Sequence, residues 1–386
     1  MTESSDESGR ARGASLRTAE VDLRQLQVPK VGADLTEVVA EDAAHICRRT
    51  GKGLDRLAGR TVLIAGGAGF LPSYLVDALA HANRHVLEEP CRVLCVDNLR
   101  TGVAGRLAHL NGRDDIVFVN RDLIEPLEPD EPVDYIVHGA SIASPTWYRR
   151  HPLETIDVNV IGTRRLLELA RDRSVEGFVY LSSSEVYGDP PPERIPTPED
   201  YWGNVSPTGP RACYDESKRL AETLCVTYQR LYGTRVVLAR PFNVYGPRLR
   251  LDDGRVVPDF LRDALLRRPI TLYSDGRVTR SFCYVADAAV ALLLLLTTDA
   301  AEGPYNVGND EEVSILRLAE LVAELAKSPH KVRLAASDDP HYLTDNPQRR
   351  SPDLSRIKAA IDWEPLVDLR TGLERTLASY AESDVR

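Results

Sequence analysis

The stretch that decides the fold is Thr61-Val-Leu-Ile-Ala-Gly-Gly-Ala-Gly-Phe-Leu-Pro72. Its first five residues are mostly apolar and β-branched, which predicts a short buried strand. Gly66 and Gly69 follow, and a helical pattern then runs from Ser73 to Ala82. Glycine lets the backbone approach a ligand closely, and the N-terminus of a helix attracts phosphate through its free N–H groups. A strand, a glycine turn and a helix in this order predict a dinucleotide-binding unit.

The residue at position 72 departs from the usual dinucleotide pattern, in which a third glycine follows Gly66 and Gly69. Proline is tolerated in the first turn of a helix, because its missing N–H would have no intrahelical partner there. Pro72 is therefore either a harmless substitution or the cause of altered helix–strand packing and a weaker hold on the cofactor.

Two later strands end in acids suited to an adenine dinucleotide. The strand 92–97 ends in Asp97, whose carboxylate can accept hydrogen bonds from a ribose and would repel a 2′-phosphate. The strand 116–122 ends in Asp122, which is suited to contact with adenine. These features favour NAD over NADP. The residues expected to hold NAD are Gly66, Ala68, Gly69, Phe70, Leu71, Asp97, Asn98, Asp122, Leu123, Ala140, Tyr214 and Lys218.

Strands and helices continue to alternate as far as residue 240. We expect strands at 133–140, 177–182 and 235–240, and helices at 152–173 and 212–231. Repeated strand–helix units predict an α/β fold with a Rossmann-type doubly wound parallel sheet, whose ligands bind beyond the carboxyl ends of the strands. The strand that ends at Ser182 would bring Ser183 to the same edge as the glycine turn.

The helix expected from Ala212 carries the candidate chemistry. Tyr214 and Lys218 are four residues apart, so they share one face of that helix. The Lys218 ammonium is expected to move the pKa of Tyr214 from about 10 towards working pH. A phenolate held in this way is a general base for a sugar or alcohol hydroxyl, with Ser183 as its hydroxyl partner. The same spacing is also common on plain helix surfaces, so its meaning depends on the sheet and the glycine turn.

Beyond residue 245 the alternation loosens into a smaller C-terminal α/β lobe. We expect helices at 256–267, 286–297, 315–327 and 371–383, and a strand at 270–273. The predicted domains are an N-terminal extension at 1–59 (a disordered tail to residue 32 and one helix at 35–57), a Rossmann domain at 60–245 and a substrate-binding lobe at 246–386. Arginines at turns suit a diphosphate or carboxylate pocket, although a surface position explains each one singly: Arg248, Arg255, Arg280, Arg349 and Arg350.

Composition argues against several classes of function. The 386 residues carry a net charge of -10, which argues against DNA or RNA as a partner. The six cysteines have neither metal-site nor disulfide spacing, so we expect reduced thiols and no metal. The start of the chain lacks the apolar core of a leader peptide, and no apolar run approaches the roughly 20 residues that span a bilayer. We therefore expect a cytoplasmic protein without a membrane partner.

Longer motifs carry a resemblance to a known family. They are Ala140–Pro145, Ser183–Pro190, Glu199–Gly203, Gly209–Glu216, Asp253–Val257 and Pro347–Asp353. With these motifs the chain, from about Thr61 to Tyr380, resembles the extended short-chain dehydrogenases/reductases that act on nucleotide sugars. Within that superfamily it is most similar to the UDP-glucuronate decarboxylases, also called UDP-xylose synthases.

The resemblance implies roles for particular residues. The catalytic residues would be Ser183, Glu185, Tyr214, Lys218 and Arg280. The residues in contact with the UDP-sugar would be Ser141, Ser144, Ser184, Asn243, Arg255, Tyr273, Arg280, Tyr284 and Arg350. The helices 152–173 and 212–231 would pair across the axis of a homodimer.

The implied reaction is the NAD-dependent conversion of UDP-glucuronate to UDP-xylose. Tyr214 would remove the proton of the 4-hydroxyl while C4 gives hydride to NAD+, the 4-keto uronate would lose CO2, and hydride would then return to C4. Glu185 and Arg280 would orient the sugar, and one of them could deliver the proton to C5. Related 4,6-dehydratases carry Asp-Glu where this chain has Ser184-Glu185, and related 4-epimerases lack both acids.

Four alternatives remain beside this reaction. They are a decarboxylase that releases the 4-keto pentose, a 4-epimerase, a 4,6-dehydratase and a non-catalytic NAD-binding protein. Ile142, Trp147 and an apparent insertion at 341–346 depart from the family pattern near the expected sugar pocket, which leaves the substrate open. Ser183 stands where threonine is frequent, a change of little consequence because both hydroxyls donate a hydrogen bond.

Overall fold

A parallel sheet of seven strands, in the order β11-β6-β5-β4-β1-β2-β3, forms the centre of the molecule. The computed structural model describes residues 37–299, 303–335 and 347–382. The strands of this sheet are β1 (Thr61–Ala65), β2 (Arg92–Asp97), β3 (Ile116–Asn120), β4 (Tyr135–His138), β5 (Gly177–Leu181), β6 (Val236–Pro241) and β11 (Tyr305–Val307). All residues of β1, β4 and β5 are buried, as expected of parallel strands covered on both faces. The strand order reverses between β1 and β4, which confirms the predicted doubly wound sheet.

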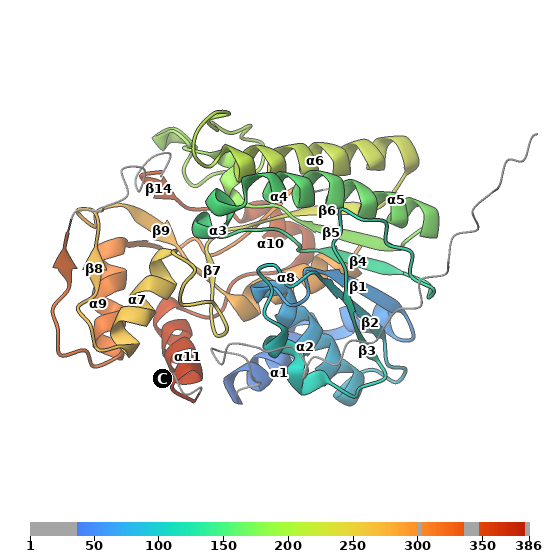
Figure 1. Cartoon of the computed structure of the whole chain (residues 1–386), viewed down its shortest axis with the longest axis horizontal. Coiled ribbons are helices and arrows are strands. Elements are labelled where there is room, and N and C mark those ends of the chain that lie inside the picture. The colour runs from blue at the N-terminus through green and yellow to red at the C-terminus, as the bar shows by residue number, and fades with distance from the viewer. Residues whose placement is uncertain (1–36, 300–302, 336–346, 383–386) are drawn as a thin grey trace, which may run out of the picture.

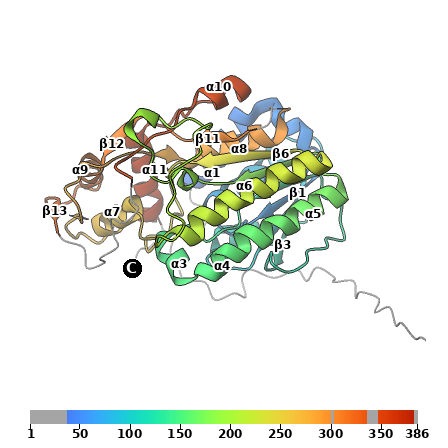
Figure 2. The same ribbon diagram turned by 90° about the horizontal axis from the view of Figure 1, so that it is seen from above.

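Helices cover both faces of the sheet (Figures 1 and 2). One face carries α3 (Pro145–Arg150), α4 (Pro152–Asp157), the π-helical turn η4 (Val158–Gly162), α5 (Thr163–Arg173) and α6 (Ala212–Tyr232). The other face carries α1 (Glu37–Thr50), α2 (Phe70–His85) and α8 (Val285–Thr297). The helix expected at 152–173 is thus divided into three pieces. Almost every residue of α8 is buried, because this helix lies between the sheet and α1, with α2 beside it.

A smaller lobe lies beside the sheet, at the left of Figure 1. Its helices are α7 (Val256–Leu265), α9 (Ile315–Leu325) and α11 (Leu369–Glu382). Its short strands are β7 (Val244–Tyr245), β8 (Thr271–Leu272), β9 (Thr279–Ser281), β10 (Cys283–Tyr284), β12 (Glu312–Ser314), β13 (Arg333–Leu334) and β14 (Arg349–Arg350). Helix α8 and strand β11 follow residue 245 in the sequence but belong to the central layers. The predicted division into two domains at 245/246 remains a prediction.

The helix of the N-terminal extension packs against the main body. It spans Glu37–Thr50 and continues into the 3-10 turn η2 (Gly51–Leu57), which together match the helix predicted at 35–57 apart from its first residues. The predicted tail at 1–32, Leu35 and the insertion at 341–346 lie outside the described residues. Among the described helices, none has the length and apolar character needed to cross a membrane.

Candidate active site

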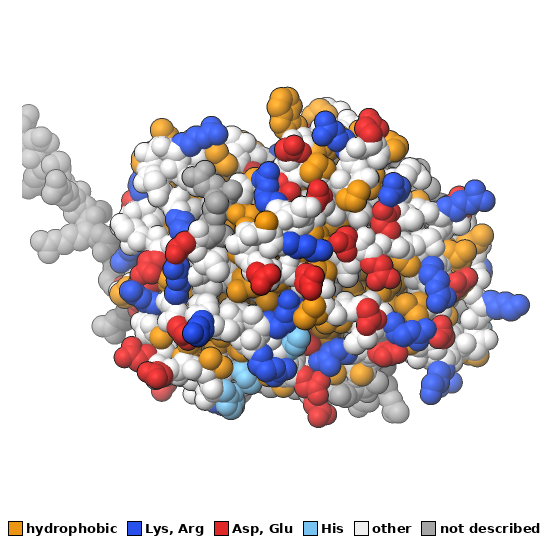
Figure 3. All heavy atoms as spheres, turned by 180° about the vertical axis from the view of Figure 1, so that it is seen from behind, with side chains coloured by type: hydrophobic (Ala, Val, Ile, Leu, Met, Phe, Trp, Pro, Cys, Tyr) orange, Lys and Arg blue, Asp and Glu red, His pale blue; other side chains and the backbone are white. Residues whose placement is uncertain are grey.

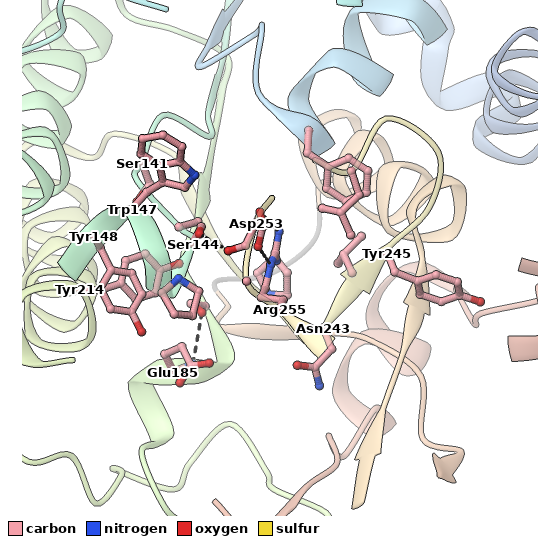
Figure 4. Close-up of a pocket in the computed structure, with 18 of the residues that line it drawn as sticks. Ser141, Ser144, Trp147, Tyr148, Glu185, Tyr214, Asn243, Tyr245, Asp253 and Arg255 are labelled. Carbon is pink, nitrogen blue, oxygen red and sulfur yellow. Dashed lines mark hydrogen bonds and ion pairs between the residues drawn. The ribbon is translucent and has the colours of Figure 1, made fainter. Parts of the chain in front are cut away.

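Two cavities lie at the carboxyl ends of the central strands, and Figure 4 shows side chains that line the larger one. Their volumes are about 420 Å³ and about 90 Å³. Five residues line both of them, namely Gly69, Thr101, Gly139, Ser141 and Ile142. The two cavities are therefore neighbouring parts of one continuous site at the edge of the sheet that the sequence predicts.

The glycine turn after β1 is shaped for close approach of a ligand. Gly66 has a φ of 77°, and a Cβ at this position would lie 2.6 Å from the Ala140 Cα. Gly69 precedes α2, and residues 69–72 line the larger cavity. The positive φ and the close approach to Ala140 thus require glycine at position 66, and the turn leads directly into α2, where the N-terminus of a helix fits the pyrophosphate of a dinucleotide.

Pro72 is accommodated in the first turn of α2. It is buried, and a Cβ on Gly139 would lie 2.6 Å from the Pro72 Cγ, so the proline ring occupies space that the glycine leaves. Helix α2 begins at Phe70 and continues through Pro72 without a break. The structure thus agrees with the harmless reading of Pro72, while its effect on the hold of the cofactor remains a prediction.

The smaller cavity contains the acids expected to contact adenosine. Asp97 Oδ2 accepts a hydrogen bond from the Ala68 N–H at 3.1 Å, and Oδ1 accepts one from the Leu99 N–H at 2.7 Å. Burial raises the pKa of Asp97, against the lowering effect of these two N–H groups. The Asn98 amide donates to Asp122 at 2.9 Å. These groups fit an adenosine ribose and its base.

Basic residues also line the smaller cavity, but each is paired with an acid. Arg100 lies 3.5 Å from Glu154, and Arg121 lies 3.2 Å from Glu125. A 2′-phosphate at Asp97 would meet a buried carboxylate before it met either guanidinium group. The cavity therefore retains the preference for NAD inferred from the sequence.

The predicted tyrosine and lysine lie buried on α6, beside the end of β5. Lys218 Nζ donates to the Leu181 carbonyl oxygen at 2.7 Å and lies 5.9 Å from the ring centroid of Tyr214. A hydrogen bond joins Tyr214 to Ser183, the hydroxyl partner expected from the sequence. The structure thus brings Ser183, Tyr214 and Lys218 together in the larger cavity.

The pKa of Tyr214 shifts in the opposite direction to the one expected. Burial raises it to about 12, because the opposing effects of Ser183 and Arg255 are smaller. Lys218 exerts less of the expected effect, since burial lowers its own pKa to about 7 and so weakens its charge near neutral pH. Tyr214 is therefore held as a neutral phenol, and further positive charge close to it would favour its ionised form.

A second tyrosine, which the sequence analysis missed, stacks on Tyr214. The ring centroids of Tyr148 and Tyr214 are 5.2 Å apart and the ring planes are inclined by 14°. Both rings lie on the same side of the cavity, near Glu185 (Figure 4). The Tyr148 hydroxyl is buried and has no hydrogen-bond partner within the described residues. Its place four residues after Ser144 was the only available signal, because the contact with Tyr214 spans 66 residues of sequence.

Glu185 lies between two arginines. One carboxylate oxygen accepts a hydrogen bond from Arg350, and the other forms an ion pair with Arg211. Burial favours a higher pKa for Glu185, but the two guanidinium groups outweigh burial and lower the pKa to about 2. Glu185 is therefore an anchored carboxylate, and the suggestion that it delivers a proton to C5 remains a prediction. Arg211 was not predicted as a site residue, although it belongs to the motif Gly209–Glu216.

The larger cavity is strongly positive inside an acidic chain. Seven arginines line it, against the acids Glu185 and Asp253: Arg106, Arg149, Arg211, Arg250, Arg255, Arg280 and Arg350. Arg280 donates to the carbonyl oxygens of Thr279 at 2.7 Å and Pro347 at 2.6 Å, and burial lowers its pKa to about 9. Lys, Arg, Asp and Glu are interspersed over the outer face in Figure 3. The concentration of positive charge in the cavity suits a ligand with several negative charges.

Most of the predicted residues line one of the two cavities. The larger cavity contains Gly69, Phe70, Leu71, Ser141, Ser144, Ser183, Ser184, Glu185, Tyr214, Lys218, Asn243, Arg255, Arg280 and Arg350. The smaller cavity contains Gly66, Gly69, Asp97, Asn98, Asp122, Leu123 and Ala140. Ala68 contributes its backbone N–H, which holds Asp97.

Two predicted substrate residues, Tyr273 and Tyr284, line neither cavity. Tyr284 is buried in the core, and its hydroxyl donates to Asp42 of α1 at 2.7 Å. Its position argues against the predicted contact with the substrate. The physical reason is that its buried hydroxyl is satisfied by a helix whose placement the sequence alone did not give.

Comparison with known proteins agrees with this geometry. Residues 62–308 match the NAD dependent epimerase/dehydratase family. UDP-glucuronic acid decarboxylase 1 of Arabidopsis thaliana is 42% identical over 319 residues, which cover 83% of this chain and 69% of that protein. UDP-glucuronic acid decarboxylase 1 of Xenopus tropicalis is 41% identical over 318 residues, which cover 82% and 71%.

Solved structures share the fold over almost their full length. An epimerase from Methanothermobacter thermautotrophicus is 28% identical with a TM-score of 0.75, covering 86% of this chain and 95% of that one. The UDP-glucuronic acid 4-epimerase of Bacillus cereus, solved with UDP-glucuronic acid and NAD, is 25% identical with a TM-score of 0.68, covering 83% and 99%. The chain therefore belongs to the NAD dependent epimerase/dehydratase family, in which it is a relative of the UDP-glucuronic acid decarboxylases.

Proposed function

We propose that this protein is an NAD-dependent decarboxylase that converts UDP-glucuronate to UDP-xylose. The observation that carries the proposal is the position of Arg211, Arg280 and Arg350 around Glu185, in the cavity that also contains Tyr214. Three guanidinium groups and one carboxylate leave an excess of positive charge, which suits the additional carboxylate of a uronate. Relatives named UDP-glucuronic acid decarboxylase at about 42% identity support the same substrate.

NAD, when bound, accepts hydride from C4 of the sugar and later returns it. The turn from Gly66 to Leu71 would hold its pyrophosphate, and Asp97 would hold the adenosine ribose. Asp122 and Leu123 would contact the adenine. Tyr214 and Lys218 would contact the other end of the cofactor, next to the sugar.

Tyr214 would remove the proton from the 4-hydroxyl of the sugar, with Ser183 hydrogen-bonded to both oxygens. Because burial raises its pKa to about 12, proton removal would depend on positive charge that enters the cavity with the ligands. After oxidation at C4, the C5–C6 bond breaks and its electron pair passes to the enolate as CO2 leaves. The protonated Tyr214 and Ser183 could then donate hydrogen bonds to the enolate oxygen.

The proton balance limits which groups can serve at C5. One proton leaves O4 and one arrives at C5 before hydride returns, and the return step adds one proton to O4, so the cycle takes up one proton from water. Glu185, with a pKa of about 2, cannot be the donor while Arg211 and Arg350 hold it. The role that remains for Glu185 is to fix the two arginines that face the substrate carboxylate.

We further propose a homodimer that acts in the cytoplasm on a UDP-sugar, with neither nucleic acid nor membrane as a partner. Exposed apolar side chains on α4, η4 and α6 support the homodimer: Leu153, Ile156, Ile161 and Leu220. These helices are the ones expected to pair across the dimer axis. The six cysteines are all free, which fits a reducing compartment.

The deciding experiment is incubation with UDP-glucuronate and NAD+, followed by mass spectrometry of the nucleotide sugar. Loss of CO2 with a fully reduced pentose is the expected result. A ketone-level pentose would favour release of the intermediate, and an unchanged mass with inverted C4 would indicate a 4-epimerase. Tyr214→Phe should lower the rate by about 10³-fold, since it removes the general base, while NAD still binds. Absence of any reaction from NAD-loaded protein would refute the proposal.

A further inference from the structure

Trp147 and Arg250 contact each other in the lining of the larger cavity. The Arg250 guanidinium carbon lies 5.0 Å from the centroid of the Trp147 ring, and both residues line the cavity. Trp147 belongs to α3, and Arg250 belongs to the loop 246–255 that follows β7. Arg150 lies over the same indole ring at 5.6 Å, but it is exposed and lies outside the cavity lining.

One end of the loop 246–255 is fastened to the glycine turn and α2. Arg106 donates to the Ala68 carbonyl oxygen at 2.8 Å and to the Arg248 carbonyl oxygen at 2.7 Å. The Arg248 side chain pairs with Asp77 of α2 at 2.5 Å, and both side chains are almost fully buried. The loop therefore cannot leave the wall that would hold the pyrophosphate without breaking buried polar contacts.

The other end of the loop is fastened to the start of α3. The Ser144 hydroxyl donates to the Asp253 carbonyl oxygen at 2.6 Å. Gly254 has a φ of 78°, and a Cβ there would lie 2.2 Å from the Thr146 Oγ1, so the two segments are in close contact. Arg250 thus lies between two attachment points, on a loop that connects the two walls of the cavity.

We propose that the Trp147–Arg250 pair is a clasp that retains the dinucleotide through the reaction cycle. A dinucleotide that extends from Asp97 past Gly69 to Tyr214 has to pass between the glycine turn and the segment 139–147. The loop 246–255 joins these same two walls, and the clasp closes it over that path. Trp147, which departs from the family pattern, thus supplies the aromatic ring that the Arg250 guanidinium contacts to close the loop.

The clasp would also determine which sugar leaves, a consequence that rests on the proposed function. The cofactor must stay in place between the removal of hydride from C4 and its return. A cofactor that dissociates after CO2 is lost leaves a UDP-4-keto pentose behind. Retention by Trp147 and Arg250 therefore favours UDP-xylose over the ketone as the released product.

Dissociation of NAD tests the clasp without any sugar. Protein loaded with radiolabelled NAD is diluted into excess unlabelled NAD, and the label that remains bound is followed by rapid filtration. Arg250→Ala and Trp147→Ala should each release NAD about fivefold faster, as the loss of a partly desolvated cation–π contact predicts. The double variant should be no faster than either single variant, because one contact is lost in all three.

Two further variants separate the clasp from general damage. Arg150→Ala removes the arginine that contacts the same ring outside the cavity, and it should leave the dissociation rate within twofold of the wild type. Trp147→Phe retains an aromatic face and should restore most of the retention if Trp147→Ala unfolds α3. Unchanged dissociation in Arg250→Ala, or equal acceleration in Arg150→Ala, overturns the proposal.

Product analysis gives an independent reading with UDP-glucuronate as substrate. The share of ketone-level pentose, measured by mass spectrometry, should rise in Arg250→Ala and stay unchanged in Arg150→Ala. If the wild-type protein has no decarboxylase activity, the proposed function fails, but the dissociation rates still decide whether the clasp exists.

Discussion

Glu185 and its two arginines are buried charges that stabilise one another. The side chains of Glu185, Arg211 and Arg350 are 17%, 15% and 6% exposed, so water contributes little to their solvation. The pKa of Glu185 falls from 4.5 to about 2, which means that folding favours its ionised form. Removal of this carboxylate would leave two guanidinium groups facing each other in a confined space.

Glu185→Gln should therefore destabilise the protein in a pH-dependent way. The folded pKa is depressed, so the stabilisation by this carboxylate is complete above pH 4.5 and is lost as the pH falls towards about 2. The shift corresponds to about 3 kcal/mol of unfolding free energy at neutral pH. Urea unfolding of wild type and Glu185→Gln at pH 7, 5 and 3.5 checks this. The difference between the two proteins should be similar at pH 7 and 5 and smaller at pH 3.5, and a difference independent of pH would contradict the assignment.

Lys218 and Tyr214 show the opposite consequence of burial. Burial lowers the pKa of the lysine to about 7 and raises that of the tyrosine to about 12, so both groups tend towards their neutral forms. The end of the cavity at Tyr214 is therefore weakly charged, and the positive charge lies with the arginines around Glu185. In the proposed reaction, proton removal by Tyr214 would therefore depend on positive charge that the bound ligands bring.

The glycine turn between β1 and α2 shows what a single element demands of its sequence. At Gly66 the positive φ and the 2.6 Å approach to the Ala140 Cα act together, since the turn must pass beside the end of β4. Gly112 has a similar φ of 80° but nothing within 4 Å of its would-be Cβ. Comparison of Gly66 with Gly112 therefore separates the effect of a positive φ from the effect of a steric clash.

Gly66→Ala should lower the free energy of unfolding by about 2 kcal/mol more than Gly112→Ala does, because only the first change forces a methyl group into neighbouring backbone. Denaturant unfolding of the two variants measures this difference. NAD binding, followed by calorimetry, should be lost in Gly66→Ala and unchanged in Gly112→Ala. Equal stability of the two variants would show that the turn relaxes around the methyl group.

Helix α1 is joined to the main body by a buried ion pair. Arg49 lies 2.7 Å from Asp287 of α8, whose side chain is fully buried, and it also donates to the Glu364 carbonyl oxygen at 2.9 Å. Asp287 accepts the backbone N–H groups of Leu366 and Val367 before α11. Through Asp287, α1 is thus connected both to α8 and to the segment that precedes α11.

Arg49→Ala should destabilise the protein by about 3 kcal/mol, because it leaves the Asp287 carboxylate buried without its cation. Arg48→Ala, a change at an exposed neighbour on the same helix, is the matched control and should have an effect below about 0.5 kcal/mol. Thermal and urea unfolding of both variants provide the comparison. Similar stability for the two would mean that α1 is only loosely attached.

At the scale of the whole molecule, an acidic chain of net charge -10 gathers seven arginines around one cavity. The apolar surface is also uneven, because Leu153 of α4 and Leu220 of α6 are 70% and 47% exposed. Exposed leucines on adjoining helices are the kind of surface that association covers. The arginine-lined cavity suits a ligand, and the exposed leucines suit the proposed association with a second copy of the chain.

Leu220→Glu should convert the proposed homodimer into monomers, because a carboxylate at the centre of an apolar interface cannot be solvated there. Light scattering coupled to gel filtration distinguishes the 42.8 kDa chain from its dimer. Leu366→Glu alters a leucine that is 58% exposed, compared with 47% for Leu220, and that lies away from α4 and α6, so it should leave the mass unchanged. A wild-type protein that runs as a monomer would contradict the dimer directly.

The sequence by itself determined the features that depend on neighbours along the chain. Strand 61–65, the glycine turn, Asp97 at the end of the next strand and the Tyr214–Lys218 spacing follow from local periodicity and from the backbone freedom of glycine. The doubly wound sheet follows from them, because strand–helix units with short connections have few ways to pack. The lobe was predicted only in outline, since its short strands leave little periodic pattern.

The tertiary structure alone decided the features that depend on burial and on contacts between distant segments. Glu185 and Arg350 are 165 residues apart, and Tyr148 meets Tyr214 only because α3 folds against α6. Tyr284 is held by Asp42 of the N-terminal helix, which no spacing in the sequence indicates. The rise in the pKa of Tyr214 has the same origin, because the local pattern supplies the lysine but only the folded chain excludes the water that would solvate its charge.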